Sequence, residues 1–105
     1  MELTDAQAMH REHGDRFQVP SPEALAEINV GYFAKVCAEP ERFWVLVTAL
    51  FGDRLRGIID NDLLKSDDHG LHCGDIIEFE LRHVHAIQKS DAASLAMARS
   101  ATNAT

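Results

Sequence analysis

The chain has 105 residues, with 17 Asp and Glu against 10 Lys and Arg, which gives a formal net charge of -7. This length fits one domain, and 46% hydrophobic residues are enough for a core of its own. The composition excludes a disordered chain, a collagen and a disulfide scaffold. An acidic surface repels phosphate backbones and anionic membranes, so we expect neither nucleic acid nor a membrane as partner.

The longest apolar run lies at Phe43–Phe51, and it is far shorter than the ~20 residues that a membrane helix needs. The first residues show no basic segment followed by an apolar stretch, so we expect neither a secretory signal nor a membrane span. These features favour a cytoplasmic protein, in which Cys37 and Cys73 are expected as reduced thiols. No Cys-x-x-Cys pair is present, and we expect no cofactor.

Residues 1–31 are predicted to be a helical N-terminal segment. Thr4 is expected to cap a short helix over residues 5–13, because its hydroxyl can accept a hydrogen bond from a free backbone N–H group. Ser21 is expected to cap a second helix, with Pro22 at the first helical position. The apolar face of this second helix is formed by Ala24, Leu25 and Ile28.

Residues 32–88 are predicted to form a β-rich body. The expected strands cover residues 32–38, 41–51, 54–60 and 76 to about 84, with residues 85–87 as a prolongation or a short fifth strand. The segment 41–51 is apolar on both faces, which is typical of a strand in the middle of a curled sheet or between two layers. Simple alternation places Phe43, Val45, Val47, Ala49 and Phe51 on one face, and Trp44, Leu46, Thr48 and Leu50 on the other.

Two glycines define the expected connections of this body. Gly52 and Asp53 form a two-residue connector that suits a type II′ hairpin turn. Gly57 lies within a strand and indicates a bulge or a close backbone approach. The whole pattern predicts an α+β domain, with N-terminal helices packed on a curled antiparallel sheet of four or five strands. Both an open sheet and a barrel-like sheet are compatible with this pattern. Residues 89–105 are expected to be a flexible tail or a short helix.

An acidic loop follows the third predicted strand. It carries five Asp between residues 60 and 75, with Lys65 as the only Lys or Arg among them. Complementary charge steers association, so this loop predicts a basic protein partner. Trp44 is expected either in the core or in a binding groove or dimer surface, because aromatic residues are enriched at interfaces. The candidate partner-binding residues are Asp60, Asp62, Asp67, Asp68, Asp75 and Trp44.

A second hypothesis rests on histidine and cysteine residues. These are ligand types that zinc prefers, but their spacing matches no established zinc pattern. Solvated loop histidines and hydrogen-bonded strand histidines explain the same residues without a metal. A metal-binding or hydrolytic protein remains an alternative, and its candidate ligands are His69, His72, Cys73, His83 and His85.

Part of the chain also resembles a known group of proteins. The residues that carry the resemblance follow one another over residues 32–88: Glu41, Arg42, Phe43, Trp44, Val45, Gly57, Asn61, Gly74, Asp75 and Ile87. In this order they are similar to small uncharacterised bacterial proteins of the YegJ-like domain-of-unknown-function family. The chain departs from the pattern at Asp62, where Pro is often seen, and in lacking an Asp-Trp pair near the end. The resemblance implies a compact α+β domain with a curled antiparallel sheet, and no reaction.

No nucleophile elbow, phosphate-binding loop or dinucleotide fingerprint is present, so an enzyme is not expected. The leading hypothesis is a non-enzymatic binding or accessory domain that recognises a protein partner through its acidic loop. The metal-binding or hydrolytic protein is the second hypothesis. The third is a domain that associates with itself, as a homodimer, through an exposed edge of its sheet.

Overall fold

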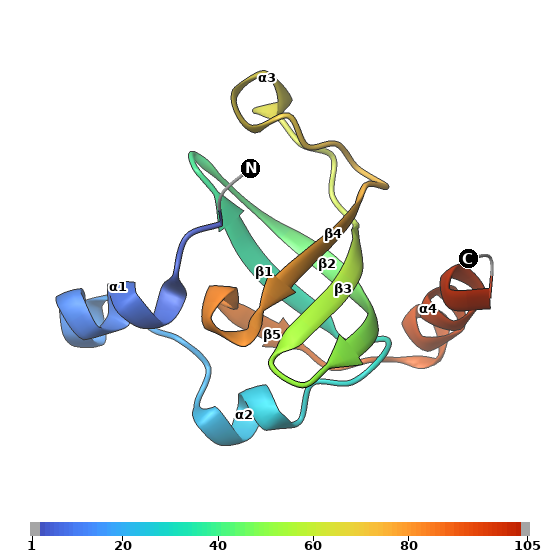
Figure 1. The fold of residues 1–105 in the computed structure, drawn as a ribbon, viewed down its shortest axis with the longest axis horizontal. Coiled ribbons are helices and arrows are strands. Elements are labelled where there is room, and N and C mark those ends of the chain that lie inside the picture. Colours follow the sequence, from blue (N-terminus) through green and yellow to red (C-terminus); the bar gives the residue numbers. More distant parts are fainter. Residues whose placement is uncertain (1–2, 104–105) are drawn as a thin grey trace.

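A computed structural model describes residues 3–103, and it confirms an α+β domain (Figure 1). Five strands form the centre, and short helices lie around them. In chain order the elements are α1 (Ala6–His13), the 3-10 turn η1 (Gly14–Arg16), α2 (Pro22–Ala26), β1 (Phe33–Ala38), β2 (Glu41–Phe51), β3 (Arg54–Ile59), α3 (Ser66–His69), β4 (Ile76–Glu80), the 3-10 turn η2 (Leu81–His83), β5 (Ala86–Gln88) and α4 (Ala92–Asn103).

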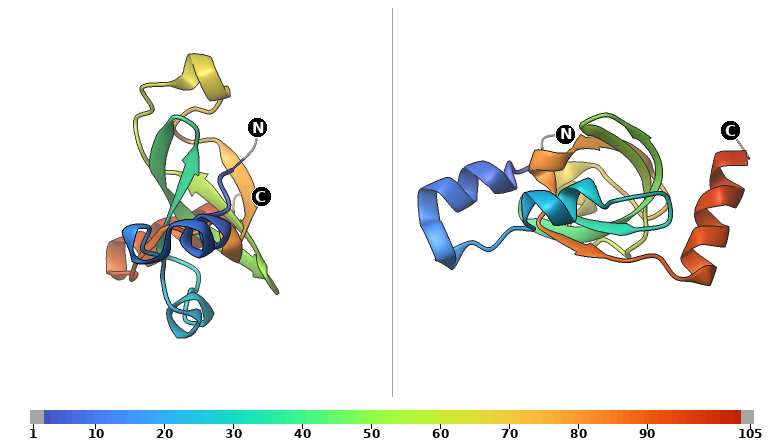
Figure 2. Two further views of the ribbon diagram at one scale, coloured as in Figure 1. Left: turned by 90° about the vertical axis from the view of Figure 1, so that its left-hand side faces the viewer. Right: turned by 90° about the horizontal axis from the view of Figure 1, so that it is seen from below.

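All five strands belong to one antiparallel sheet with the order β4-β3-β2-β1-β5. The first four strands follow one another as a meander, and η2 then leads the chain to the far edge, where β5 pairs with β1. The sheet is strongly curled (Figure 2), but its edge strands β4 and β5 do not pair with each other. The predicted curl is therefore present without barrel closure.

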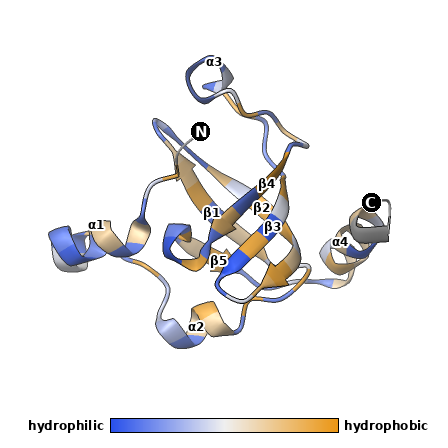
Figure 3. Ribbon diagram, in the orientation of Figure 1, coloured by the Kyte–Doolittle hydropathy of each residue, from blue (hydrophilic) through white to orange (hydrophobic). Residues whose placement is uncertain are grey.

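The core lies on the concave side of this sheet. Hydrophobic residues follow the strands, whereas α3 is predominantly hydrophilic (Figure 3). Burying one such aliphatic or aromatic side chain contributes about 1.5–3 kcal/mol, so the curled sheet itself holds most of the apolar stabilisation. The largest side chains that are fully buried are Phe43, Leu55, Ile59, Val36, Val45, Val47 and Val84.

A β-bulge in β2 changes the predicted alternation. The register between β2 and β3 shifts between Val47 and Ala49, so Thr48 is the extra residue of the bulge. Beyond the bulge Leu50 lies opposite the buried Leu55 and shares its side of the sheet. Ala49 and Phe51 are therefore turned to the outer side, and Phe51 is 52% exposed. The prediction that these two residues share the face of the buried strand residues is wrong, because one extra residue reverses the side-chain period.

Gly52 is required by its backbone conformation, whereas Gly57 is required because it has no side chain. Gly52 has φ 65°, and no other residue type has positive φ in the described chain, which identifies the Gly52–Asp53 connector as a type II′ turn. At Gly57 a Cβ atom would lie 2.5 Å from both the Leu46 carbonyl oxygen and Val45 Cγ1. The close backbone approach is confirmed, and the bulge lies on the facing strand.

The fourth strand is shorter than predicted. It ends at Glu80, and residues 81–83 form η2 instead of continuing the strand to residue 84. Nδ1 of His83 accepts a hydrogen bond from the Glu80 backbone N–H group at 3.0 Å, which stabilises the turn at the point where the chain leaves the edge. The short fifth strand, β5, begins at Ala86. His83 therefore lies in η2 and His85 lies just before β5, so the two histidines do not belong to one strand.

The helix termini follow ordinary capping chemistry. Asp5, rather than the predicted Thr4, caps α1, and its carboxylate accepts the Ala8 N–H group at 2.9 Å. Ser21 caps α2 as predicted. Within the predicted tail, residues 92–103 form α4, which packs on β2 at the opposite end of the molecule from α1 (Figure 1), and residues 104 and 105 lie outside the described residues.

Candidate functional site

A shallow hollow of about 200 Å³ lies on the outer side of the sheet, beside Trp44. Phe33, Trp44, Asp60 and Gln88 line it. The Trp44 side chain is half-buried, so it belongs to a surface recess rather than to the core. Two of the predicted partner-binding residues, Trp44 and Asp60, are thus brought together.

The backbone of three strands places these side chains. Phe33 and Gln88 face each other across the β1–β5 pair. The Asp60 N–H group donates to the Trp44 carbonyl oxygen at 2.9 Å, where the chain leaves β3. The Asn61 side-chain oxygen in turn accepts the Trp44 N–H group. Asp60 is therefore held next to the indole by main-chain bonds.

The hollow has the chemistry of a cation site. The Lys35 ammonium lies 5.5 Å from the centroid of the Trp44 ring, on the neighbouring residue across the β1–β2 pair. An aromatic face attracts a cation through its quadrupole, and a nearby carboxylate adds direct charge attraction. The indole already holds one cation of the chain itself, and Asp60 supplies the carboxylate.

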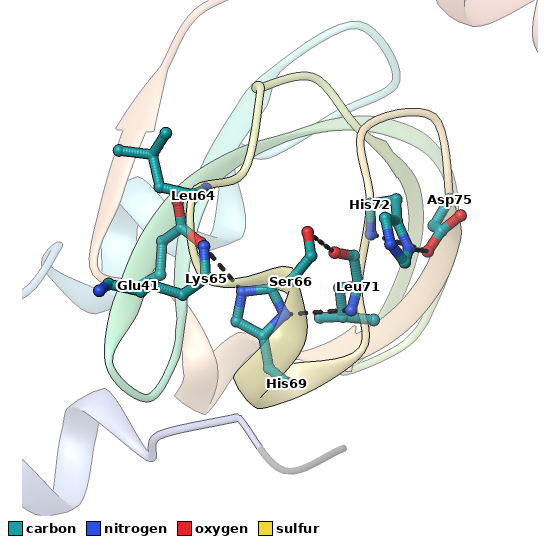
Figure 4. A network of polar contacts seen from close by, with 8 residues as sticks. All are labelled: Glu41, Leu64, Lys65, Ser66, His69, Leu71, His72 and Asp75. Carbon is teal, nitrogen blue, oxygen red and sulfur yellow. Dashed lines mark hydrogen bonds and ion pairs between the residues drawn. The ribbon is translucent and has the colours of Figure 1, made fainter.

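Glu41 fixes the acidic loop to the start of β2 (Figure 4). Its carboxylate accepts the backbone N–H groups of Leu64 and Lys65 at 2.8 and 3.0 Å. It also accepts a hydrogen bond from His69 Nε2 at 2.9 Å. These donors, His69 first, lower the pKa of Glu41 below its ordinary value. Sequence reasoning missed this role of Glu41, because its partners lie more than twenty residues away.

His69 has no free ring nitrogen. The Leu71 backbone N–H group donates to His69 Nδ1 at 3.0 Å, which leaves the ring proton on the Nε2 atom that faces Glu41. The side chain is only 4% exposed and packs beside Phe43, with ring centroids 6.2 Å apart. Its position therefore makes His69 part of the loop's internal framework.

The aspartates of the loop have two different roles. Asp75 accepts the His72 backbone N–H group at 2.9 Å, and thereby closes the turn that precedes β4. The remaining carboxylates lie in exposed positions, where they add negative charge around the loop. These exposed residues are Asp60, Asp62, Asp67 and Asp68.

The predicted metal ligands are not assembled into a common group. Cys73 is exposed and lies 3.7 Å from the Ile59 carbonyl oxygen. His83 is buried at η2, whereas His85 is buried against Phe17. Burial is the main cause that lowers the pKa of both histidines. Within the part of the chain whose side chains are described, no three His, Cys, Asp or Glu residues form a group that could hold a metal ion.

The structure also contains a groove that the sequence did not indicate. Its volume is about 610 Å³, and it lies between α4, β2 and the segment that follows α2. Gly31 lets α4 approach here, because a Cβ atom at this position would lie 3.0 Å from Leu95 Cα and would require a shift of a few tenths of an ångström. The lining residues are Glu27, Asn29, Val30, Tyr32, Thr48, Ser90, Leu95 and Arg99.

Comparisons with known proteins provide no further assignment. No family model, no curated protein and no solved structure matches the chain. The resemblance to the YegJ-like family therefore stays a prediction. None of the described helices is both long enough and apolar enough to cross a membrane.

Proposed function

We propose that the protein is a non-enzymatic binding domain that recognises a basic segment of a protein partner. The observation that carries this proposal is the hollow in which Trp44 and Phe33 lie beside the Asp60 carboxylate. A lysine or arginine of the partner would enter this hollow, with its charge at Asp60 and its aliphatic stem along the rings. We place this function in the cytoplasm, consistent with the two free thiols.

Lys35 defines how the hollow would work. Its ammonium lies over the Trp44 ring, so an incoming cation has to displace it. The exchange of one cation for another costs little, because the Lys35 side chain is long and reaches solvent from the same strand. The exposed Asp62, Asp67 and Asp68 side chains would raise the encounter rate with a basic segment, and this effect falls with added salt.

A titration of the full chain with a short lysine- and arginine-rich peptide, followed by ¹⁵N–¹H NMR, tests the proposal. We expect saturable shifts around Trp44 and Asp60, and about tenfold weaker binding for Trp44→Ala and for Asp60→Asn. Asp53→Asn is the matched control, since it removes the same charge from an exposed position in the β2–β3 turn.

Two outcomes would count against the proposal. Equal weakening by Asp60→Asn and Asp53→Asn would show a response to net charge alone. Shifts that leave the indole N–H signal of Trp44 unchanged at saturation would place the peptide elsewhere.

Self-association is a second candidate function. β4 pairs with β3 only and therefore is an edge strand, and its first residue, Ile76, is 58% exposed. Unpaired strand edges with exposed apolar residues favour pairing with a second copy. Sedimentation velocity of the native chain and of Ile76→Lys distinguishes this case, because only a β4-mediated dimer would dissociate in the variant.

A further inference from the structure

A second hollow carries positive charge on this acidic protein. It has a volume of about 310 Å³ and is lined by Arg16, Phe17, Gln18 and Arg42. Arg16 is the last residue of η1, and Arg42 lies near the start of β2. We call this cavity the Arg16–Arg42 hollow. Its residues do not overlap with those of the hollow beside Trp44.

Arg42 is oriented but has no acidic partner. Its guanidinium carbon lies 5.6 Å from the centroid of the Phe17 ring. Arg56 has a similar position, 5.1 Å from Phe51, but its guanidinium also bonds to the Glu78 carboxylate at 3.1 Å. Among the side chains that the structure describes, no carboxylate lies within ion-pair distance of either Arg16 or Arg42. The N–H groups of both arginines are therefore open to a ligand.

The wall of the hollow is held in place before any ligand binds. His10 Nδ1 donates to the Phe17 carbonyl oxygen at 2.6 Å, and the Phe17 N–H group donates to the Gly14 carbonyl oxygen at 3.1 Å. The Phe17 ring also packs edge-on against His85, with centroids 5.3 Å apart. A preformed wall lowers the entropy that binding costs.

His85 adds an unusual feature behind this wall. It is only 8% exposed, and both ring nitrogens lack a hydrogen-bond partner among the described atoms. Burial lowers the pKa of His85, and the charges of Arg42 and Lys35 lower it further, while Glu39 acts in the opposite direction. The charge of Arg42 thus acts on the imidazole that packs against the Phe17 ring.

We propose that the Arg16–Arg42 hollow binds the phosphate group of a small phosphate monoester. Two guanidinium groups on separate elements suit a tetrahedral anion, whose three oxygens can accept from both. One planar carboxylate is already satisfied by a single guanidinium fork, so it gains less from the second arginine. The Gln18 amide is a further donor at the rim. The volume lies at the lower end of small-molecule sites, which are about 300–1,000 Å³, and so fits a small ligand.

The test uses the full chain with orthophosphate and with acetate as probes, in parallel NMR titrations at constant ionic strength. We expect saturable shifts for orthophosphate at the Phe17 and Gln18 amides, and binding of acetate that is at least about tenfold weaker. Equal affinity for the two anions would overturn the assignment to phosphate. Shifts that remain linear and unsaturated up to high phosphate concentration would overturn the site.

Three variants locate the binding. Arg42→Gln and Arg16→Gln are each expected to weaken orthophosphate binding about tenfold, because each removes a charged donor of the hollow. Arg56→Gln is the matched control, since it also removes an arginine above a phenylalanine ring but one that already has a carboxylate partner. The use of two variants on separate elements keeps the test valid if one of them destabilises the fold. If Arg42→Gln and Arg16→Gln bind orthophosphate as tightly as Arg56→Gln does, the proposal is refuted.

Discussion

The sharpest prediction concerns Gly57→Ala. The added Cβ would lie 2.5 Å from the Leu46 carbonyl oxygen and 2.5 Å from Val45 Cγ1. Favourable contacts between carbon atoms occur at about 3.5–4.0 Å, so β3 and β2 would have to separate by about 1 Å at this point. β2 cannot yield easily, because its other edge is paired with β1 and its inner face is in the core.

The cost follows from this geometry. Overpacking by one methyl group typically lowers the free energy of unfolding by about 1–3 kcal/mol. The added methyl group meets two atoms of the paired strand β2, so we expect a loss of about 3 kcal/mol for Gly57→Ala. With an m value of about 1.5 kcal/mol/M, the midpoint of urea unfolding should fall by about 2 M. The chain contains one tryptophan, so fluorescence of Trp44 together with circular dichroism follows the transition.

Gly70→Ala is the matched control for this prediction. Gly70 has φ 77°, and nothing lies within 4 Å of the position that its Cβ would occupy. Only backbone strain acts there, and it costs about 1–2 kcal/mol. If Gly57→Ala lowers the urea midpoint no more than Gly70→Ala does, the argument from the close backbone approach is wrong.

Four further predictions concern polar groups. Glu41→Gln should increase amide hydrogen exchange at Leu64 and Lys65, because an amide oxygen accepts more weakly than a carboxylate; unchanged exchange would contradict the anchoring role. Since folding lowers the pKa of Glu41, its stabilisation is present above the ordinary glutamate pKa of 4.5 and is lost in more acidic solution, and Glu41→Gln should reduce this acid dependence of urea unfolding. The pKa of His85 is also lowered, so the unfolded chain binds more protons as the pH falls below 6.5, and His85→Leu should flatten the stability profile between pH 7.5 and about 5. Native mass spectrometry with stoichiometric zinc should return the metal-free mass, and a stable one-to-one zinc complex would revive the metal-binding hypothesis.

Much of the sheet was predictable because its signals are local. Alternation from Phe43 to Val47 and the Gly52–Asp53 turn specify β2, β3 and their register up to the bulge. The bulge at Thr48 was not predictable, since nothing in the alternation of β2 shows that one residue is extra relative to the facing strand. The turn at Leu81–His83 was also missed. The apolar Leu81 continues the alternating pattern in the sequence, although the strand itself ends at Glu80.

In the candidate site, too, residue types were predictable from the sequence, whereas contacts between distant segments were not. The sequence identified Trp44 and Asp60 by residue type, but their proximity depends on the end of β3 returning beside β2. Phe33 and Gln88 were not predicted as neighbours, because they meet only through the β1–β5 pair. His69 was a candidate ligand in the alternative metal hypothesis, and its structural role becomes visible only through its hydrogen bond with the distant Glu41.

The pairing of β1 with β5 has a consequence for synthesis of the chain. β1 finds its first partner at once in the adjacent β2, but its other edge is completed by residues 86–88, which leave the ribosome much later. During this interval Phe33, Ala34 and Lys35 present unpaired backbone groups beside an apolar surface, the arrangement that promotes intermolecular strand pairing. The nascent chain is therefore most exposed to aggregation before its last strand emerges, and the lysine within this edge provides a charge that opposes it.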